Sequence, residues 1–133
     1  MIVVLIIGLL ATLALPFVES ARRRAHATRF SNDFRKFEAA FQQYNLEHGS
    51  WPVAGAPGLF PPGMSTYLPP NFAAPSPMGG NYSWSGTTGR IRLTGTTADD
   101  AVMQRVDDMI DNGDLLSGDF SKMTSGGYHL QLH

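Results

Sequence analysis

The sequence lacks cysteine altogether, and its charges nearly cancel, with 10 basic and 11 acidic residues and a formal net charge of -1. The absence of cysteine excludes disulfide bridges, thiolate nucleophiles and cysteine metal sites. The small net charge gives the chain as a whole no electrostatic preference for nucleic acid or for acidic surfaces. A length of 133 residues leaves room for one domain with a modest core.

Recognisable catalytic motifs are also missing. The histidines His26, His48, His129 and His133 do not form a metal-binding pattern such as H-E-x-x-H, and no G-x-S-x-G elbow is present. No set of acid, base and nucleophile can be assembled from the remaining motifs. The sequence therefore predicts a protein that is not an enzyme and needs no cofactor.

The first 18 residues form an apolar run without a single charge, in which Thr12 is the one polar side chain. About 20 apolar residues are needed to cross a bilayer as a helix, so the run is near the required length. A cleaved signal peptide is the alternative, but no basic segment precedes the run and no small-x-small site follows it cleanly. We therefore expect residues 1–18 to insert into a membrane. Arg22, Arg23 and Arg24 follow the run, and the positive-inside rule alone would place them in the cytoplasm.

Helical character continues beyond this run. Residues 17–48 contain neither proline nor glycine, whereas Gly49 and Pro52 predict an end to the helix. Within the apolar run, Gly8 weakens the helix and Pro16 kinks it. A helix over residues 1–48 would be about 70 Å long, which is more than a chain of this size can bury. Aromatic residues at spacings of four, three, four and three predict one core-facing seam, made of Phe30, Phe34, Phe37, Phe41 and Tyr44.

The remaining residues predict a small head. Residues 51–80 hold eight of the nine prolines and predict a long loop, packed through Trp51, Leu59, Phe60, Tyr67, Leu68 and Phe72. Residues 81–85 and 90–94 predict a hairpin, and 128–132 a last strand. Thr97 with Asp100 resembles a capping box, opening a helix that places Val102, Val106, Met109 and Ile110 on one face and ends at Gly113.

The stretch MIVVLIIGLLATLALPFVESARRRAHATRFSNDFRKFEAAFQQYNLEHGSWP resembles the N-terminal region of type IV pilins and of type II secretion pseudopilins. In that family an apolar run holds a glycine and, eight residues later, a proline, which Gly8 and Pro16 match. The break at Gly49 and Pro52 is also similar to pseudopilins. The resemblance covers residues 1–52. The chain begins where the family would be about six residues past its processing site, so the leader and the methylated phenylalanine of the family are absent from it.

The resemblance implies an α+β, pilin-like fold, in which a long kinked N-terminal helix packs on a small antiparallel sheet with one extra short helix. Residues 1–18 would form the membrane and filament-core half of the helix, 19–49 its amphipathic half, and 50–133 the head.

The expected function is that of a filament subunit, foremost a pseudopilin in protein transport by a type II secretion-like system. Its partners would be copies of itself or related pilins, an inner-membrane assembly platform and, before assembly, the bilayer. The head would lie on the periplasmic side of a bacterial inner membrane, and the filament in the periplasm or outside the cell. The helix surface used for assembly would include Leu5, Ile6, Gly8, Leu9, Leu13 and Pro16.

Other interpretations stay open. A minor pilin could bind DNA or a surface through its arginines, although the acidic head argues against nucleic acid as a partner. A membrane-anchored periplasmic domain without a role in assembly is a further alternative. Acidic residues after the predicted second helix offer oxygen ligands of the kind that Ca²⁺ prefers, and some pseudopilins bind calcium in C-terminal loops. The ligands of this weak calcium candidate would include Asp111, Asp114 and Asp119. The alternative interpretation is an acidic turn that is solvated and binds no metal.

Overall fold

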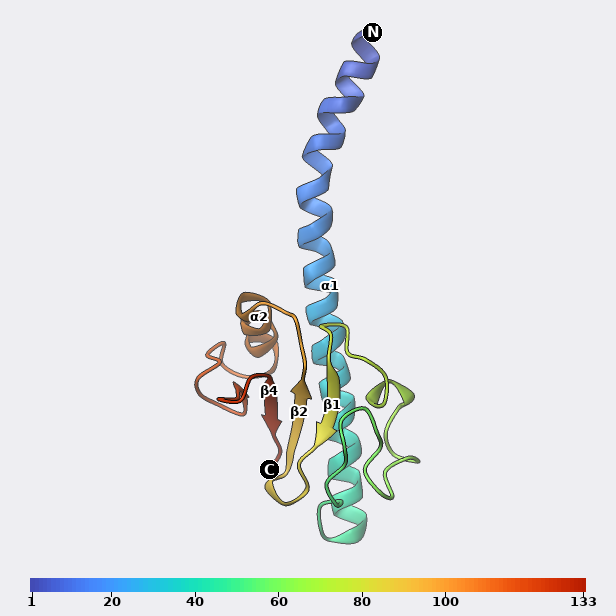
Figure 1. Ribbon diagram of the computed structural model, residues 1–133, viewed down its shortest axis with the longest axis vertical. Helices are drawn as coiled ribbons and strands as arrows, with labels where there is room; N and C mark the ends of the chain where they lie inside the picture. The colour runs from blue at the N-terminus through green and yellow to red at the C-terminus, as the bar shows by residue number, and fades with distance from the viewer.

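The computed structural model describes residues 1–12, 18–86 and 88–133. It is an α+β protein in which one long helix lies along a small antiparallel sheet (Figure 1). Helix α1 spans Ile2–His48, and the head surrounds only its C-terminal part. Gly49 adopts a left-handed conformation with φ of 71° and donates its N–H to the carbonyl of Asn45 at 2.7 Å. This αL cap ends the helix where the sequence predicts its end.

The sheet has four strands in the order β1-β2-β4-β3, and all neighbours are antiparallel. The strands are β1 (Asn81–Trp84), β2 (Arg90–Thr94), β3 (Phe120–Lys122) and β4 (Tyr128–Gln131). A short 3₁₀ turn, η2 (Gly86–Thr88), connects β1 to β2 in the expected hairpin. The three-residue β3 was not expected from the sequence, because only Phe120 in it is buried and the strand is too short to show a period of two.

The core forms where the inner face of the sheet meets one face of α1. Phe34 contacts Phe120 of β3 at a ring distance of 5.9 Å, and Phe37 contacts Tyr82 of β1 at 4.8 Å. One turn further on, Phe41 stacks on Trp84 with ring centres 3.9 Å apart. Phe37 and Phe41 thus follow one another along β1 while Phe34 reaches β3, so aromatic contacts on successive turns fix α1 against the sheet.

The proline-rich loop of residues 51–80 packs along the outer edge of β1. Gly55 and Gly58 donate N–H bonds to the carbonyls of Trp84 and Tyr82, at 3.1 and 2.9 Å, and so cover an edge that would otherwise be open. The loop includes the 3₁₀ turn η1 (Pro70–Phe72), whose Phe72 is fully buried. Leu59, expected to help to pack the loop, is instead 61% exposed.

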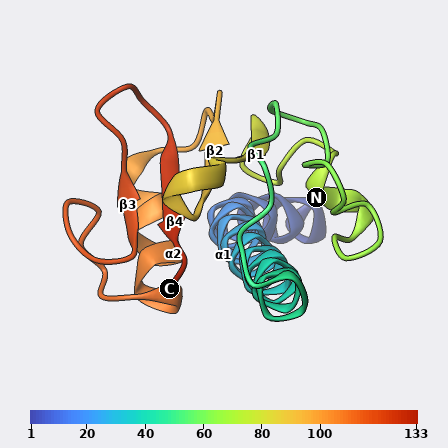
Figure 2. The same cartoon turned by 90° about the horizontal axis from the view of Figure 1, so that it is seen from below.

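Helix α2 spans Asp100–Ile110 and packs on α1 (Figures 1 and 2). Its N-cap is Asp99 and makes no side-chain capping bond, so the expected capping box that starts at Thr97 is wrong. Of the expected face, Val106 is buried and Val102 and Ile110 are partly buried against the core, whereas Met109 is 38% exposed. Met103 and Asp107 are buried as well, although they were not expected on this face from the sequence. The helix ends at Ile110, and Gly113 lies in the turn beyond it.

Candidate functional site

The N-terminal part of α1 presents an apolar surface that no other described residue covers. Every large side chain from Ile2 to Leu10 is at least half exposed, the lowest value being 51% for Ile6. Because successive helical residues are rotated by about 100°, these nine residues expose apolar groups all round the helix. A helix that is apolar on every side is normally buried in a protein core or in a membrane.

Two small details adapt this surface to an apolar environment. Gly8 has no neighbouring atom within 4 Å of the position that a Cβ would occupy, and it leaves a recess flanked by Val4, Leu5 and Leu9. The hydroxyl of Thr12 donates to the carbonyl of Leu9 at 2.7 Å. The one polar side chain of the run therefore satisfies its donor within the helix, as a group in lipid or between helices must.

Of the residues expected to form the assembly surface, Leu5, Ile6, Gly8 and Leu9 lie on this exposed part. Leu13 and Pro16 lie outside the described residues, and so does the expected kink. Among the residues that the structure describes, no helix has an apolar stretch long enough to span a membrane.

The aromatic seam holds the head at the other end of α1. Phe30, Phe34, Phe37 and Phe41 are completely buried, and Tyr44 is partly buried against Tyr67. The seam leaves the apolar N-terminal part outside the packed head, and the arginines Arg22 to Arg24, which lie between the two, are exposed. The molecule has two distinct halves: a folded head, and a bare apolar rod that projects from it (Figure 1).

The three acidic residues considered for calcium serve as hydrogen-bond acceptors in the loop after α2. Asp111 accepts the backbone N–H groups of Asp119 and Phe120, at 2.6 and 3.4 Å. Asp114 accepts the N–H of Leu116 and the hydroxyl of Ser117, and Asp119 lies 2.7 Å from the imidazole of His133. Within the described residues, no three acidic or histidine side chains gather closely enough to hold a metal ion.

Asp107 belongs to the same acidic region but is not among the three expected calcium ligands. Its side chain is fully buried, and in the described part of the chain neither carboxylate oxygen has a hydrogen-bond partner. Burial, followed by repulsion from Asp111 and Asp108, raises the pKa of its carboxyl to about 6. The burial of Asp107 could have been predicted from the helical spacing. It lies four residues after Met103 and one after Val106, which places it on the buried face of α2.

Comparison of the chain with known proteins gives no relative from which a role can be read: no protein-family model, curated protein or solved structure matches it. The arrangement of its own residues is therefore what indicates function. The described surface offers a place for other helices or lipid to pack, and that place lies apart from the folded head.

Proposed function

We propose that this chain is a structural subunit of a type IV pilin-like filament, of the pseudopilin kind, which polymerises through the N-terminal part of α1. The observation that carries the proposal is the uncovered apolar surface from Ile2 to Leu10 on a helix whose other end is locked into a folded head. Exposed apolar surfaces of this extent mark sites of association with protein or membrane.

The physical logic concerns the transfer of a subunit from bilayer to filament. A helix with aliphatic side chains on all sides packs on acyl chains and on identical helices with similar energy. The subunit can therefore leave lipid without exposing its apolar residues to water. We infer that residues 1–18 sit in a bacterial inner membrane before assembly, with the head on the periplasmic side, and that an assembly platform in that membrane is a partner.

The pilin-like layout supports the same proposal. A long N-terminal helix packed on a small antiparallel sheet, with one short extra helix, is the arrangement that the N-terminal resemblance implies. A subunit of this kind needs no catalytic group, and its function lies in its contacts.

Cross-linking between subunits tests the proposal. Cysteines replacing Leu5 and Leu9 should form disulfides between different copies when the full chain is produced together with its natural assembly partners, because the native sequence has no cysteine to compete. A cysteine at Val53, which is 71% exposed on the head, is the matched control and should cross-link far less. Filaments should be visible by electron microscopy in material sheared from the cells. A chain that stays monomeric in the membrane, without helix cross-links or filaments, would overturn the proposal.

A further inference from the structure

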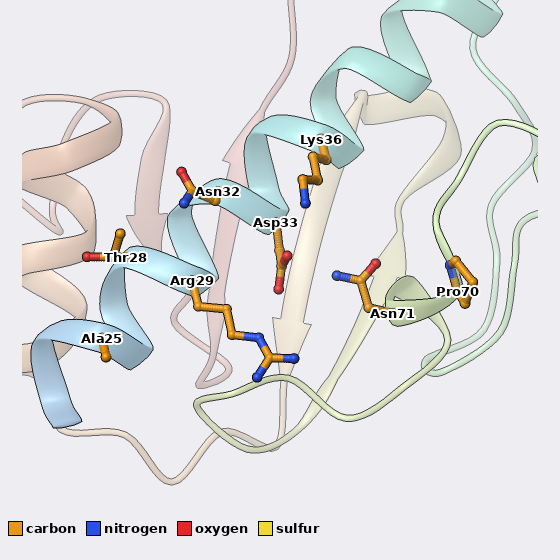
Figure 3. Close-up of a pocket in the computed structure, with 8 residues that line it drawn as sticks. All are labelled: Ala25, Thr28, Arg29, Asn32, Asp33, Lys36, Pro70 and Asn71. Atoms are coloured by element: carbon orange, nitrogen blue, oxygen red, sulfur yellow. The ribbon is translucent and has the colours of Figure 1, made fainter.

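A polar groove runs along α1 on the side where the proline-rich loop packs. It has a volume of about 810 Å³ and lies between α1 and η1. In Figure 3, Arg29, Asp33 and Lys36 of α1 extend into the space in front of Asn71. Arg29 and Lys36 are exposed, so the groove carries two cations against the single carboxylate of Asp33.

A smaller hollow adjoins this groove and has a mixed lining, in which one wall is apolar. Its volume is about 130 Å³, and Ala74, Pro75 and Pro77 form its walls beside Arg29 and Asp33. Tyr82 also borders it and is completely buried, and its hydroxyl has no hydrogen-bond partner in the described part of the chain. The hollow exceeds the volume of several water molecules. Its volume is therefore large enough to hold a small side chain.

The opposite flank of the head presents complementary features in the loop between α2 and β3, residues 111–119. Leu116 at its tip is 88% exposed. Asp108 and Asp114 are exposed nearby, and the bonds from Leu116 N–H and Ser117 to Asp114 keep the tip in one shape. The loop thus offers one apolar side chain flanked by carboxylates.

These two flanks face away from each other. In both Figure 1 and Figure 2, α2 and β3 lie on one side of α1, and the loop that contains η1 lies on the other. Different patches on opposite sides cannot form a two-fold dimer from one contact. A contact between two such patches is head-to-tail, and a contact of that kind repeats along a ring or an open helical filament.

We propose that the groove receives the α2–β3 loop of a second copy of this chain, an inference that rests on the proposed filament function. Leu116 of one copy fills the hollow beside Ala74, Pro75 and Pro77 of the next, where its apolar surface leaves water. Asp108 and Asp114 then lie near Arg29 and Lys36. Burial of Leu116 supplies part of the attraction, and the opposite charges add to it and set the register of the contact, so that reversing one set replaces attraction by repulsion.

The test uses the full chain, produced with its natural assembly partners, and places cysteines at Asn71 and Ser117. Oxidation of the double variant should yield a ladder of dimers, trimers and larger products, because each copy carries both halves of a head-to-tail contact. Each single variant should yield little cross-linked product. Cysteines at Leu5 and Leu9 in a parallel sample report helix contacts independently.

Charge reversal supplies the second arm. Arg29→Glu with Lys36→Glu should reduce the ladder at least tenfold, and Asp108→Lys in the same chain should restore part of it. Asp114 is left in place because its carboxylate holds the tip of the loop. Arg24→Glu changes an exposed arginine outside the groove and should leave the ladder intact. Unchanged thermal unfolding of each variant shows that the head remains folded.

The outcomes separate the two proposals. The groove contact is wrong if filaments and helix cross-links form without a ladder, or if charge reversal does not change the ladder. Either result leaves the proposed filament function unaffected. The absence of filaments, helix cross-links and ladder together would overturn both.

Discussion

At the scale of single residues, the aromatic seam determines how firmly the head holds α1. Phe37 is completely buried and contacts both Phe72 and Tyr82, at ring distances of 5.0 and 4.8 Å. Phe37→Ala should reduce the free energy of unfolding by about 3 to 5 kcal/mol, because it removes these contacts and leaves a cavity. Chemical unfolding of the full chain in mild detergent measures the change. Leu46→Ala, at a position 86% exposed on the same helix, is the control and should cost little. Equal losses in both variants would contradict the packing role of the seam.

Asp107 predicts an unusual pH dependence. Its carboxyl ionises near pH 4 in the unfolded chain but at about pH 6 in the folded one, because burial and the neighbouring Asp111 and Asp108 disfavour the charged form. Between these values the folded state binds a proton that the unfolded state has lost. The contribution of Asp107 to stability therefore falls as pH rises from 4 to 6, by about 2 to 3 kcal/mol, and stays low above pH 6.

The variant Asp107→Asn isolates this contribution from that of the other carboxyls. It should match the wild-type chain near pH 4 and unfold at a higher temperature than wild type at pH 7. Asp108→Asn, an exposed neighbour, should keep most of the wild-type pH dependence. A constant difference between Asp107→Asn and wild type across pH 4 to 7 would show that the buried carboxyl does not titrate as described.

At the scale of elements, the turn between β3 and β4 depends on two adjacent glycines with different surroundings. Both have positive φ, 84° at Gly126 and 90° at Gly127. A Cβ at Gly126 would meet no atom within 4 Å, whereas one at Gly127 would overlap the carbonyl oxygen of Leu93 in β2. Gly126→Ala should therefore cost about 1 to 2 kcal/mol for the left-handed backbone alone. Gly127→Ala should cost clearly more, because β4 must move from β2. Urea unfolding compares the two, and equal costs would contradict the predicted strand clash.

The predictable elements are those in which local chemistry and tertiary packing agree. Regular spacing of phenylalanines, a glycine at residue 49 and turn residues at 86–89 indicate α1 and the first hairpin directly from the sequence. Strand β3 escapes such reasoning because its three residues are stabilised by their partners in β4 rather than by their own pattern. The start of α2 was misplaced because the neighbouring Thr96 holds the chain before the helix: its hydroxyl donates to the carbonyl of Met78 and accepts the N–H of Ala98, and the helix begins only after Asp99.

The candidate surfaces divide in the same way. An apolar run is visible in any sequence, so the exposed surface of Ile2 to Leu10 follows from composition once a compact head is known to leave it bare. The groove at Arg29 and Lys36 cannot be predicted from composition, because its other wall consists of Asn71 and the prolines of a loop about 40 residues away in the sequence. Loop positions of this kind are set by backbone bonds to β1, which no local pattern encodes.

At the scale of the whole molecule, the head and the apolar rod are stabilised by different contacts. The head is stabilised within one chain by α1, the sheet and the proline-rich loop. The N-terminal part of α1, residues 2–10, packs on no other described part of the chain, so its stability in water comes from helix propensity, which is small. Substitutions on the rod should therefore change association with lipid or other copies while leaving unfolding of the head unaltered.

Gly8 offers the most direct test of this separation. Gly8→Leu adds a side chain where the isolated chain has only open space, and it should slightly favour the helix, by about 1 kcal/mol relative to glycine. Unfolding of the head should not change. If neighbouring helices approach one another at the recess beside Leu5 and Leu9, however, the added leucine separates them, and the number of sheared filaments should fall several-fold while the chain still enters the membrane. Gly8→Ala, which adds a single methyl group, should have an intermediate effect. Filament counts by electron microscopy, with membrane fractionation in parallel, measure both quantities. Wild-type filament numbers in Gly8→Leu would mean that the recess faces lipid or solvent in the assembly and takes no part in helix packing.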